Sequence, residues 1–255
     1  MSLNETFLLF NQLEHYVKNK NFVRLGSIGS VLPQVEFYLD VAKNKKIKNI
    51  CEIGFYAGHS TATWLLANPN VIVHSFDFFN NKQMNKSKNI LQSRFPERIF
   101  TYPGSSLKTI PKLKKYLGCD LVHIDGRHHY KYVILDYINI KAHSHSDTLF
   151  LFDDICDTQN CTVSWNGDGY PVCAHPAIAV CDLVQNNAIR PLKTYFKGSR
   201  QFGLYRSYNS TIHLKNMNAN CSMQFYNKTI MKYWLKNSVK QDIRFYQQNL
   251  KRFYE

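Results

Sequence analysis

Short apolar runs alternate with amphipathic segments through the central part of the chain. The runs cover residues 47–53, 71–76, 99–102, 120–124 and 148–152, and each predicts a buried strand. After each run the apolar residues recur every three or four positions, which predicts helices over 61–67, 84–95, 107–117, 130–141 and 176–184. Strands that alternate with helices at this spacing are typical of the α/β class. We therefore expect a doubly wound, mostly parallel sheet with helices on both of its faces.

Further elements are expected on both sides of this alternation. Segments 192–196 and 202–206 predict an antiparallel hairpin, which brings the expected sheet to seven strands. Helices are also predicted over 6–17, 33–43 and 230–254, the last of them basic and amphipathic. The expected organisation is an N-terminal helical addition over 1–25, a central domain over 26–206, and a linker with a C-terminal helix over 207–255.

Polar residues and glycines follow the ends of the expected strands. In doubly wound sheets the carboxyl ends of parallel strands meet at one edge, and ligands bind beyond that edge. Chance would scatter such residues over both ends of the strands, so their common position indicates a functional site. The residues are Glu52, Asp77, Gly104, Ser105, Ser106, Asp125, Asp153 and Asp154.

The first strand leads into the pattern Glu52-x-Gly54-x-x-x-Gly58-x-Ser60. Glycines in such a turn let a ligand approach the backbone closely, and the helix that follows offers N–H groups to an anion. Asp77, at the end of the second strand, is placed to accept hydrogen bonds from ribose hydroxyls. The glycine spacing alone also fits a plain strand-to-helix turn. The presence of Asp77 at the end of the next strand is what favours a nucleotide-type cofactor.

The stretch EIGFYAGHS, from Glu52 to Ser60, resembles the glycine loop of catechol O-methyltransferase and its relatives among the class I methyltransferases that use S-adenosylmethionine (SAM). The resemblance spans roughly residues 26–206 and implies a Rossmann-like domain. It also implies that the loop holds the methionine part of SAM, that Asp77 holds the ribose, and that the serines after the third strand border the adenine. The cofactor-binding residues expected on this basis are Glu52, Gly54, Gly58, Ser60, Asp77, Gly104, Ser105, Ser106 and Asp125.

Three aspartates suggest a divalent cation. Carboxylates at adjacent strand ends repel one another unless a cation lies between them, and oxygen ligands suit Mg²⁺ or Mn²⁺. The alternative is that one aspartate caps a helix and another faces solvent. The resemblance extends to the macrocin-type sugar O-methyltransferases and implies that Asp125, Asp153 and Asp154 bind Mg²⁺.

The general base is less well defined by the resemblance. The catechol enzymes have a lysine where this chain has His128, three residues after Asp125. Histidine can accept a proton near neutral pH, so His128, His129 and Asp125 itself are alternative catalytic residues. The chain also differs from these relatives at the polar stretch 143–147, where they have a glycine turn before the fifth strand.

The cysteines and the lengths of the apolar runs bear on the cellular compartment. Of seven cysteines, Cys51 and Cys119 lie in or beside expected buried strands, and no Cys-x-x-Cys pair marks a zinc site. We interpret these two cysteines as reduced core thiols in a cytoplasmic protein. No apolar run approaches the roughly 20 residues of a membrane span, and no signal peptide is predicted.

The net charge of +14 admits nucleic acid as a partner, but the lysines are scattered and no arginine-rich tract is interleaved with aromatic residues. We expect a metal-dependent O-methyltransferase acting on a small hydroxylated molecule, able to form a homo-oligomer through its terminal helices. The alternatives are an RNA methyltransferase and a non-catalytic SAM-binding or interaction module.

Overall fold

The computed structural model describes residues 3–16, 28, 31–155, 174–197 and 200–208. The chain divides into two compact units. The first unit comprises Met1–Gly126 and Asn139–Thr148, and the second comprises Arg127–Ile138 and Leu149–Glu255.

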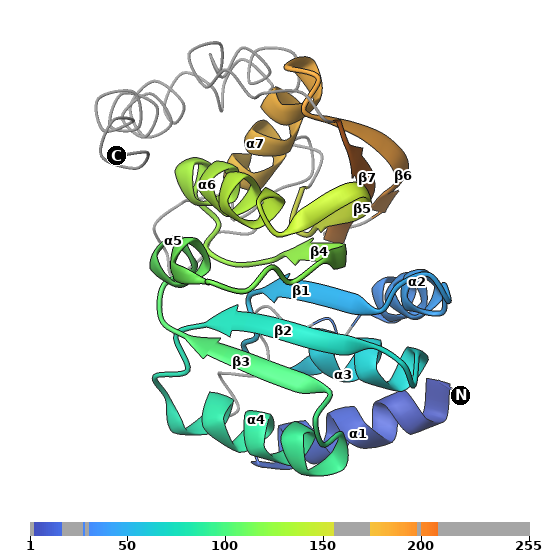
Figure 1. The fold of residues 1–255 in the computed structure, drawn as a ribbon. Helices are drawn as coiled ribbons and strands as arrows, with labels where there is room; N and C mark the ends of the chain where they lie inside the picture. Colours follow the sequence, from blue (N-terminus) through green and yellow to red (C-terminus); the bar gives the residue numbers. More distant parts are fainter. Residues whose placement is uncertain (1–2, 17–27, 29–30, 156–173, 198–199, 209–255) are drawn as a thin grey trace, which may run out of the picture. The chain divides into compact units, whose positions relative to one another are not determined.

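The strands form a seven-stranded sheet in the order β3-β2-β1-β4-β5-β7-β6 (Figure 1). In the first unit β1 pairs in parallel with both β2 and β4, and β2 pairs in parallel with β3. In the second unit β7 pairs antiparallel with β5 and with β6. The expected Rossmann-like sheet with an antiparallel terminal hairpin is thus confirmed. The strands are β1 (Asn49–Ile53), β2 (Ile72–Asp77), β3 (Ile99–Pro103), β4 (Cys119–Ile124), β5 (Ser144–Phe152), β6 (Ile189–Lys197) and β7 (Arg200–Ser207).

The helices of the first unit pack on one another beside the parallel strands. Helix α3 contacts α1, α2 and β2, and α1 also contacts α4 (Figure 1). In the second unit α7 packs against β6. The helices are α1 (Leu3–Tyr16), α2 (Leu32–Ala42), α3 (His59–Ala67), α4 (Lys82–Arg94), α5 (Ser106–Thr109), α6 (Tyr130–Lys141) and α7 (Ala174–Gln185), with a 3₁₀ turn, η2 (Ile110–Lys112), after α5.

Two elements differ from the sequence-based expectation. The helix predicted over 107–117 is only α5 and η2, because Pro111 has no N–H group to donate to the preceding turn, and the backbone is extended at Leu113. Strand β5 begins at Ser144 rather than at residue 148, and the backbone N–H of Cys119 donates to the carbonyl of His143 at 2.9 Å. The predicted helix 230–254 lies outside the described residues.

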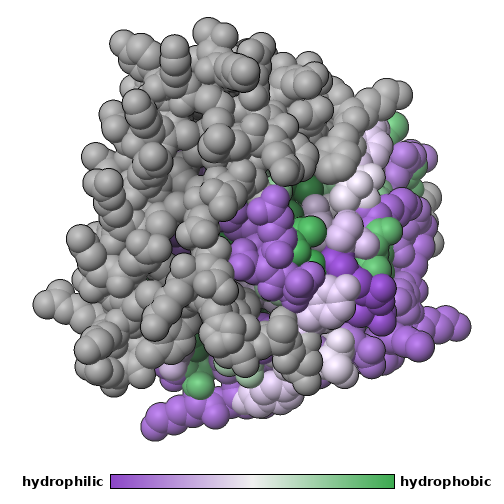
Figure 2. Space-filling model, turned by 90° about the horizontal axis from the view of Figure 1, so that it is seen from above, coloured by the Kyte–Doolittle hydropathy of each residue, from purple (hydrophilic) through white to green (hydrophobic). Residues whose placement is uncertain are grey.

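Large exposed apolar side chains are few among the described residues and are spread over different elements. Figure 2 shows a face on which the described residues are mostly hydrophilic, with small hydrophobic areas between them. Among these residues no helix has both the length and the apolar character that crossing a membrane requires. The exposed apolar side chains are Leu8, Leu32, Phe78, Phe100, Tyr116, Leu192 and Tyr208.

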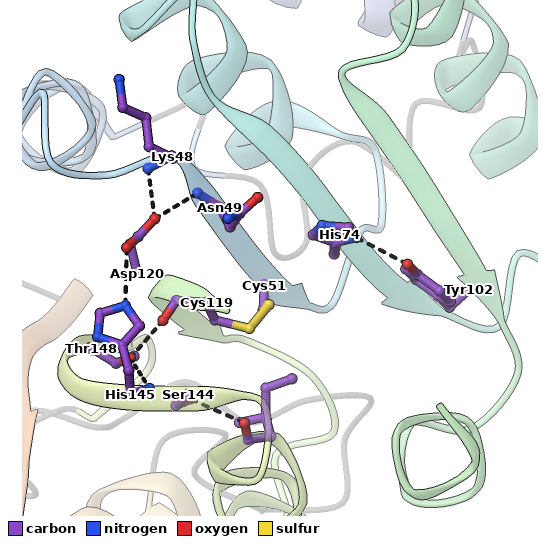
Figure 3. Close-up of a disulfide and its surroundings, with 11 residues drawn as sticks. Lys48, Asn49, Cys51, His74, Tyr102, Cys119, Asp120, Ser144, His145 and Thr148 are labelled. Carbon is purple, nitrogen blue, oxygen red and sulfur yellow. Dashed lines mark hydrogen bonds and ion pairs between the residues drawn. A yellow bond between two sulfur atoms is a disulfide. The ribbon is translucent and has the colours of Figure 1, made fainter. Parts of the chain in front are cut away.

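The cysteine chemistry differs from the prediction of reduced thiols. Cys51 in β1 and Cys119 in β4 form a disulfide, with their Cα atoms 5.7 Å apart (Figure 3). Cys181 in α7 is disulfide-bonded as well. The sequence pattern correctly predicts that Cys51 and Cys119 are buried. It carries no information about their pairing, which arises only when residues far apart in the chain become neighbours in the sheet.

The buried His74 of β2 makes folding stability sensitive to pH. Its Nδ1 atom lies 3.0 Å from the Tyr102 hydroxyl. Burial raises the pKa of Tyr102, so this hydroxyl stays protonated at neutral pH. Burial, with smaller effects from Lys115 and His143, lowers the pKa of His74 from 6.5 to about 4. The unfolded chain therefore binds a proton at a higher pH than the folded chain does.

We expect this difference to remove stability as the pH falls from 6.5 towards 4. Between pH 7 and pH 5 the loss attributable to His74 is about 2 kcal/mol. Urea unfolding over this range should be compared with the same series for His74→Gln, which keeps a polar group beside Tyr102 but does not titrate. Equal pH dependence in the two proteins would contradict the assignment.

Candidate active site

The glycine loop after β1 is held in a conformation that depends on its glycines. Gly54 has φ +104°, and a Cβ atom at this position would overlap the backbone carbonyl of Asp125, which follows β4. Gly58 has φ +80° and lies immediately before α3. The N–H of Gly54 donates to the carbonyl of Phe76 at 2.9 Å, and that of Asp125 donates to Ile53 at 2.9 Å. The carboxyl ends of β1, β2 and β4 are therefore joined directly beneath the loop.

The carboxylate of Asp77, at the end of β2, fixes the shape of this loop. Its Oδ2 atom accepts the backbone N–H groups of Phe55 and Tyr56 at 2.8 and 3.0 Å, and its Oδ1 atom accepts that of Phe78 at 2.6 Å. A carboxylate offers about four acceptor positions, so three are used here and one remains, on Oδ1. Asp77 thus combines a structural role in the loop with one acceptor position for a ligand.

The Glu52 carboxylate lies in a buried hydrogen-bond network. It is fully buried, and its carboxylate accepts hydrogen bonds from Thr61, from Trp64 at 3.2 Å and from Ser75 at 3.0 Å. His123 of β4 lies 3.6 Å from the same carboxylate. Glu52 therefore joins β1 to α3, β2 and β4 beneath the loop.

This buried network extends to helix α2. The Tyr38 hydroxyl of α2 lies 3.0 Å from Nε2 of His123, and the Gln34 side chain donates to that hydroxyl at 3.1 Å. Sequence reasoning missed the contact between the helices and the sheet because Gln34 and Tyr38 lie in α2, whereas His123 lies in β4, 85 positions beyond Tyr38. The only signal is that three polar side chains occupy positions on otherwise apolar faces.

The two residues that begin α3 are also largely buried. His59 lies 3.4 Å from the Glu14 carboxylate and packs edge-on against Phe10, both in α1. Ser60 is buried too. Tyr56, by contrast, is half-buried at the tip of the loop with φ +46°. Burial raises its pKa to about 12, so its phenol stays protonated at neutral pH.

The residues after β3 reach the same edge of the sheet. The N–H of Gly104 donates to the backbone carbonyl of Asp77 at 2.9 Å, and Gly104 has φ +122°. Ser105 caps α5, with its carbonyl accepting the N–H groups of Lys108 and Thr109. Ser105 and Ser106 are both half-buried. The expected cofactor-binding residues on β1, β2, β3 and β4 are thus brought to one edge of the first unit.

The second unit holds the remaining predicted site residues. Asp153 and Asp154 follow β5 directly and are both buried, and Asp154 has φ +54°. The N–H of Asp154 donates to Oδ1 of Asp153 at 2.9 Å. Nε2 of His128 lies 3.2 Å from Oδ2 of Asp154. This unit therefore places two neighbouring carboxylates and one imidazole together.

His129 and the start of α6 are fixed by residues that sequence reasoning missed. Nδ1 of His175, in α7, accepts the backbone N–H of Tyr130 at 3.2 Å, and the ring of His175 packs edge-on against that of His129 at 5.6 Å. The Tyr130 hydroxyl donates to Asp182 at 2.6 Å. His175 lies 45 residues beyond Tyr130, so no local spacing could reveal the contact.

The chain matches a family model described as a methyltransferase domain over residues 51–155. Residues 51–155 form a methyltransferase domain. This segment runs from β1 to the residues after β5, so it includes every predicted cofactor-binding and metal-binding residue. The expectation of a class I methyltransferase is confirmed.

Solved structures with the fold of this methyltransferase domain share little sequence with the chain. The SAH-bound methyltransferase PaMTH1 of Podospora anserina is 15% identical with a TM-score of 0.62, over 79% of this chain and 88% of that one. An SAH complex of an O-methyltransferase from Bacillus cereus is 16% identical with a TM-score of 0.58, over 78% and 91%.

A third similar structure is the O-methyltransferase TomG of Streptomyces achromogenes, involved in tomaymycin synthesis and bound to SAM. It is 14% identical with a TM-score of 0.59, over 77% of this chain and 89% of that one. A comparison with curated proteins finds no match. At these identities the solved structures establish the fold of the methyltransferase domain.

Proposed function

We propose that this chain is a SAM-dependent O-methyltransferase that acts on a hydroxyl group of a small molecule. The observation that carries the proposal is the Asp77 clamp, in which a carboxylate at the end of β2 holds the glycine loop and keeps one acceptor position. The solved O-methyltransferases with SAM or SAH bound share this fold and support the choice of cofactor.

The cofactor would be recognised mainly by the first unit. The remaining acceptor position on Asp77 suits one ribose hydroxyl. Phe78 is the next residue and is 57% exposed, so its ring is available to stack on a flat base. Gly104, Ser105 and Ser106 follow the neighbouring strand β3 and would border that base. SAM supplies a methyl sulfonium, and the chain's part is to orient it towards the acceptor.

A divalent cation fits the donor set of this chain. Asp153 and Asp154 are buried neighbours, and buried carboxylates need a compensating charge. The proposed carboxylate ligands supply oxygen atoms, which suits Mg²⁺ or Mn²⁺. Asp125, which follows β4, is the third ligand that the family resemblance implies. Such an ion would lower the pKa of a bound hydroxyl.

Removal of the acceptor proton falls to one of the bases expected from the sequence. Asp125, His128 and His129 remain the alternatives. In the second unit His128 lies against a carboxylate, and His129 packs against the imidazole of His175. Tyr56 is excluded as a base at neutral pH, since its phenol holds its proton up to a pKa of about 12.

The direct test is methyl transfer from labelled SAM to a panel of catechols, sugars and RNA. We expect transfer to at least one small hydroxylated acceptor and none to RNA. Transfer to RNA alone would favour the nucleic-acid alternative, which the net charge of +14 keeps open. Binding of SAM without transfer to any acceptor would favour a non-catalytic module.

A second experiment tests the metal. We expect EDTA to abolish turnover and Mg²⁺ or Mn²⁺ to restore it. Asp153→Ala should lose most activity while its Kd for SAM stays within about threefold of wild type, because the cofactor residues lie on other strands. The control is Asp147→Ala, a variant of an exposed aspartate near the opposite end of β5. Full activity in EDTA would refute the metal proposal and leave the SAM assignment standing.

A further inference from the structure

The disulfide between Cys51 and Cys119 is built into the core of the cofactor-binding unit. Both cysteines are fully buried, and their Cα separation of 5.7 Å is within the usual range for a disulfide. Cys51 immediately precedes Glu52, the residue that joins β1 to α3, β2 and β4. The bond therefore links the strand that leads into the glycine loop with the beginning of β4.

The backbone around the bond is fixed by several hydrogen bonds (Figure 3). Oδ2 of Asp120, next to Cys119, accepts the backbone N–H groups of Lys48 and Asn49 at 2.8 Å each. Its Oδ1 atom lies 3.0 Å from Nε2 of His145, and the Thr148 hydroxyl donates to the carbonyl of Cys119 at 2.6 Å. The two sulfur atoms are thus held together by a rigid frame and shielded from solvent. A soluble thiol could reach them only after the unit opens.

Cys181 gives a second, independent observation in the other unit. This residue of α7 is also disulfide-bonded. Two disulfides in two units are not what proteins of a reducing compartment normally contain, because thioredoxin and glutathione keep their thiols reduced.

We infer that this chain matures in an oxidising compartment and that Cys51–Cys119 is a permanent structural bond of the methyltransferase domain. In forming the bond the two thiols give up two protons and two electrons. These reduce one disulfide of an oxidising protein, or of oxidised glutathione, to two thiols. The inference of an oxidising compartment replaces the expectation of a cytoplasmic protein with reduced cysteines. It does not depend on which acceptor the enzyme methylates.

The decisive experiment determines the redox state of the native protein. Cells that make it are quenched with acid, the protein is denatured in N-ethylmaleimide without reductant, and its peptides are analysed by mass spectrometry. We expect a linked pair of peptides containing Cys51 and Cys119. N-ethylmaleimide on both residues in most molecules would overturn the inference. Denaturation before alkylation matters, because buried free thiols would otherwise escape the reagent and look oxidised.

A second measurement tests whether the bond is structural. The cysteines are 68 positions apart in sequence, so the crosslink restricts the unfolded chain strongly. We expect the purified full-length protein to lose roughly 5 to 15 °C in its thermal midpoint when it is reduced in denaturant and refolded under reductant. Reduction also opens the Cys181 bond, so Cys51→Ala/Cys119→Ala, which loses only the core bond, should melt between oxidised and reduced wild type. Cys181→Ala, which keeps this bond, is the matched control. An oxidised wild type no more stable than the double variant would contradict the structural role.

Discussion

Replacing Asp77 with alanine is expected to raise the Kd for SAM by about 100-fold. The variant loses the acceptor position proposed for the ribose, and it also releases the N–H groups of Phe55, Tyr56 and Phe78, which hold the loop in shape. Hydrogen bonds to a charged group contribute about 1.5 to 3 kcal/mol each, and about 2.8 kcal/mol corresponds to a factor of 100. Isothermal titration calorimetry with SAM measures the effect directly.

Two further variants separate ribose binding from general damage. Asp77→Asn keeps an acceptor oxygen without the charge, so its affinity should lie between those of wild type and Asp77→Ala. Asp40→Ala removes an exposed carboxylate of α2 that pairs only with Lys43 among the described residues at 3.1 Å, and it should bind SAM like wild type. Equal affinity in wild type and Asp77→Ala would refute the ribose assignment, provided both proteins melt as folded domains.

Gly54→Ala should be the most damaging single substitution in the loop. The methyl group meets the carbonyl of Asp125, and alanine rarely adopts the φ of +104° required here. Strain in the backbone and overpacking together should cost about 4 kcal/mol, which is a large share of the stability of a typical domain. Equilibrium unfolding in urea measures the loss, and a change in near-ultraviolet circular dichroism would show whether the loop distorts instead.

Gly118→Ala is the matched control for this substitution. Gly118 also has a positive φ, +63°, but a Cβ atom there would only make an ordinary 3.5 Å contact with the ring of Tyr116. This variant should lose only the stability that backbone strain costs, about 1 to 2 kcal/mol. Similar losses in the two variants would show that the overlap at Gly54 is relieved by a small shift of the chain.

The sequence predicts the strands of this protein well because a parallel sheet buries both faces of each strand and so leaves continuous apolar runs. The same logic locates Asp77 and Asp125, since a polar residue that ends an apolar run must lie at the carboxyl end of a strand. The helix before β4 was predicted too long because a helical spacing of apolar residues continues beyond Pro111, whereas the backbone cannot continue as an α-helix there.

What the sequence could not reveal depends on pairs of residues distant in the chain. The Glu52 carboxylate contacts Trp64, Ser75 and His123, which lie on three other elements, and no local pattern predicts these contacts. The bond between Cys51 and Cys119 has the same origin. Local periodicity reports which face of an element is buried, and only the strand order determines what meets that face.

The buried position of Glu52 has a consequence for synthesis on the ribosome. Strands β1, β2 and β3 precede β4 in the chain, yet β4 lies beside β1 in the sheet and carries His123, the neighbour of the Glu52 carboxylate on that side. Until β4 has left the ribosome, β1 presents an open edge and a carboxylate with an incomplete set of partners. We therefore expect the nascent chain to remain dependent on chaperones until residues well beyond Ile124 have emerged, and then to close around Glu52 in one cooperative step.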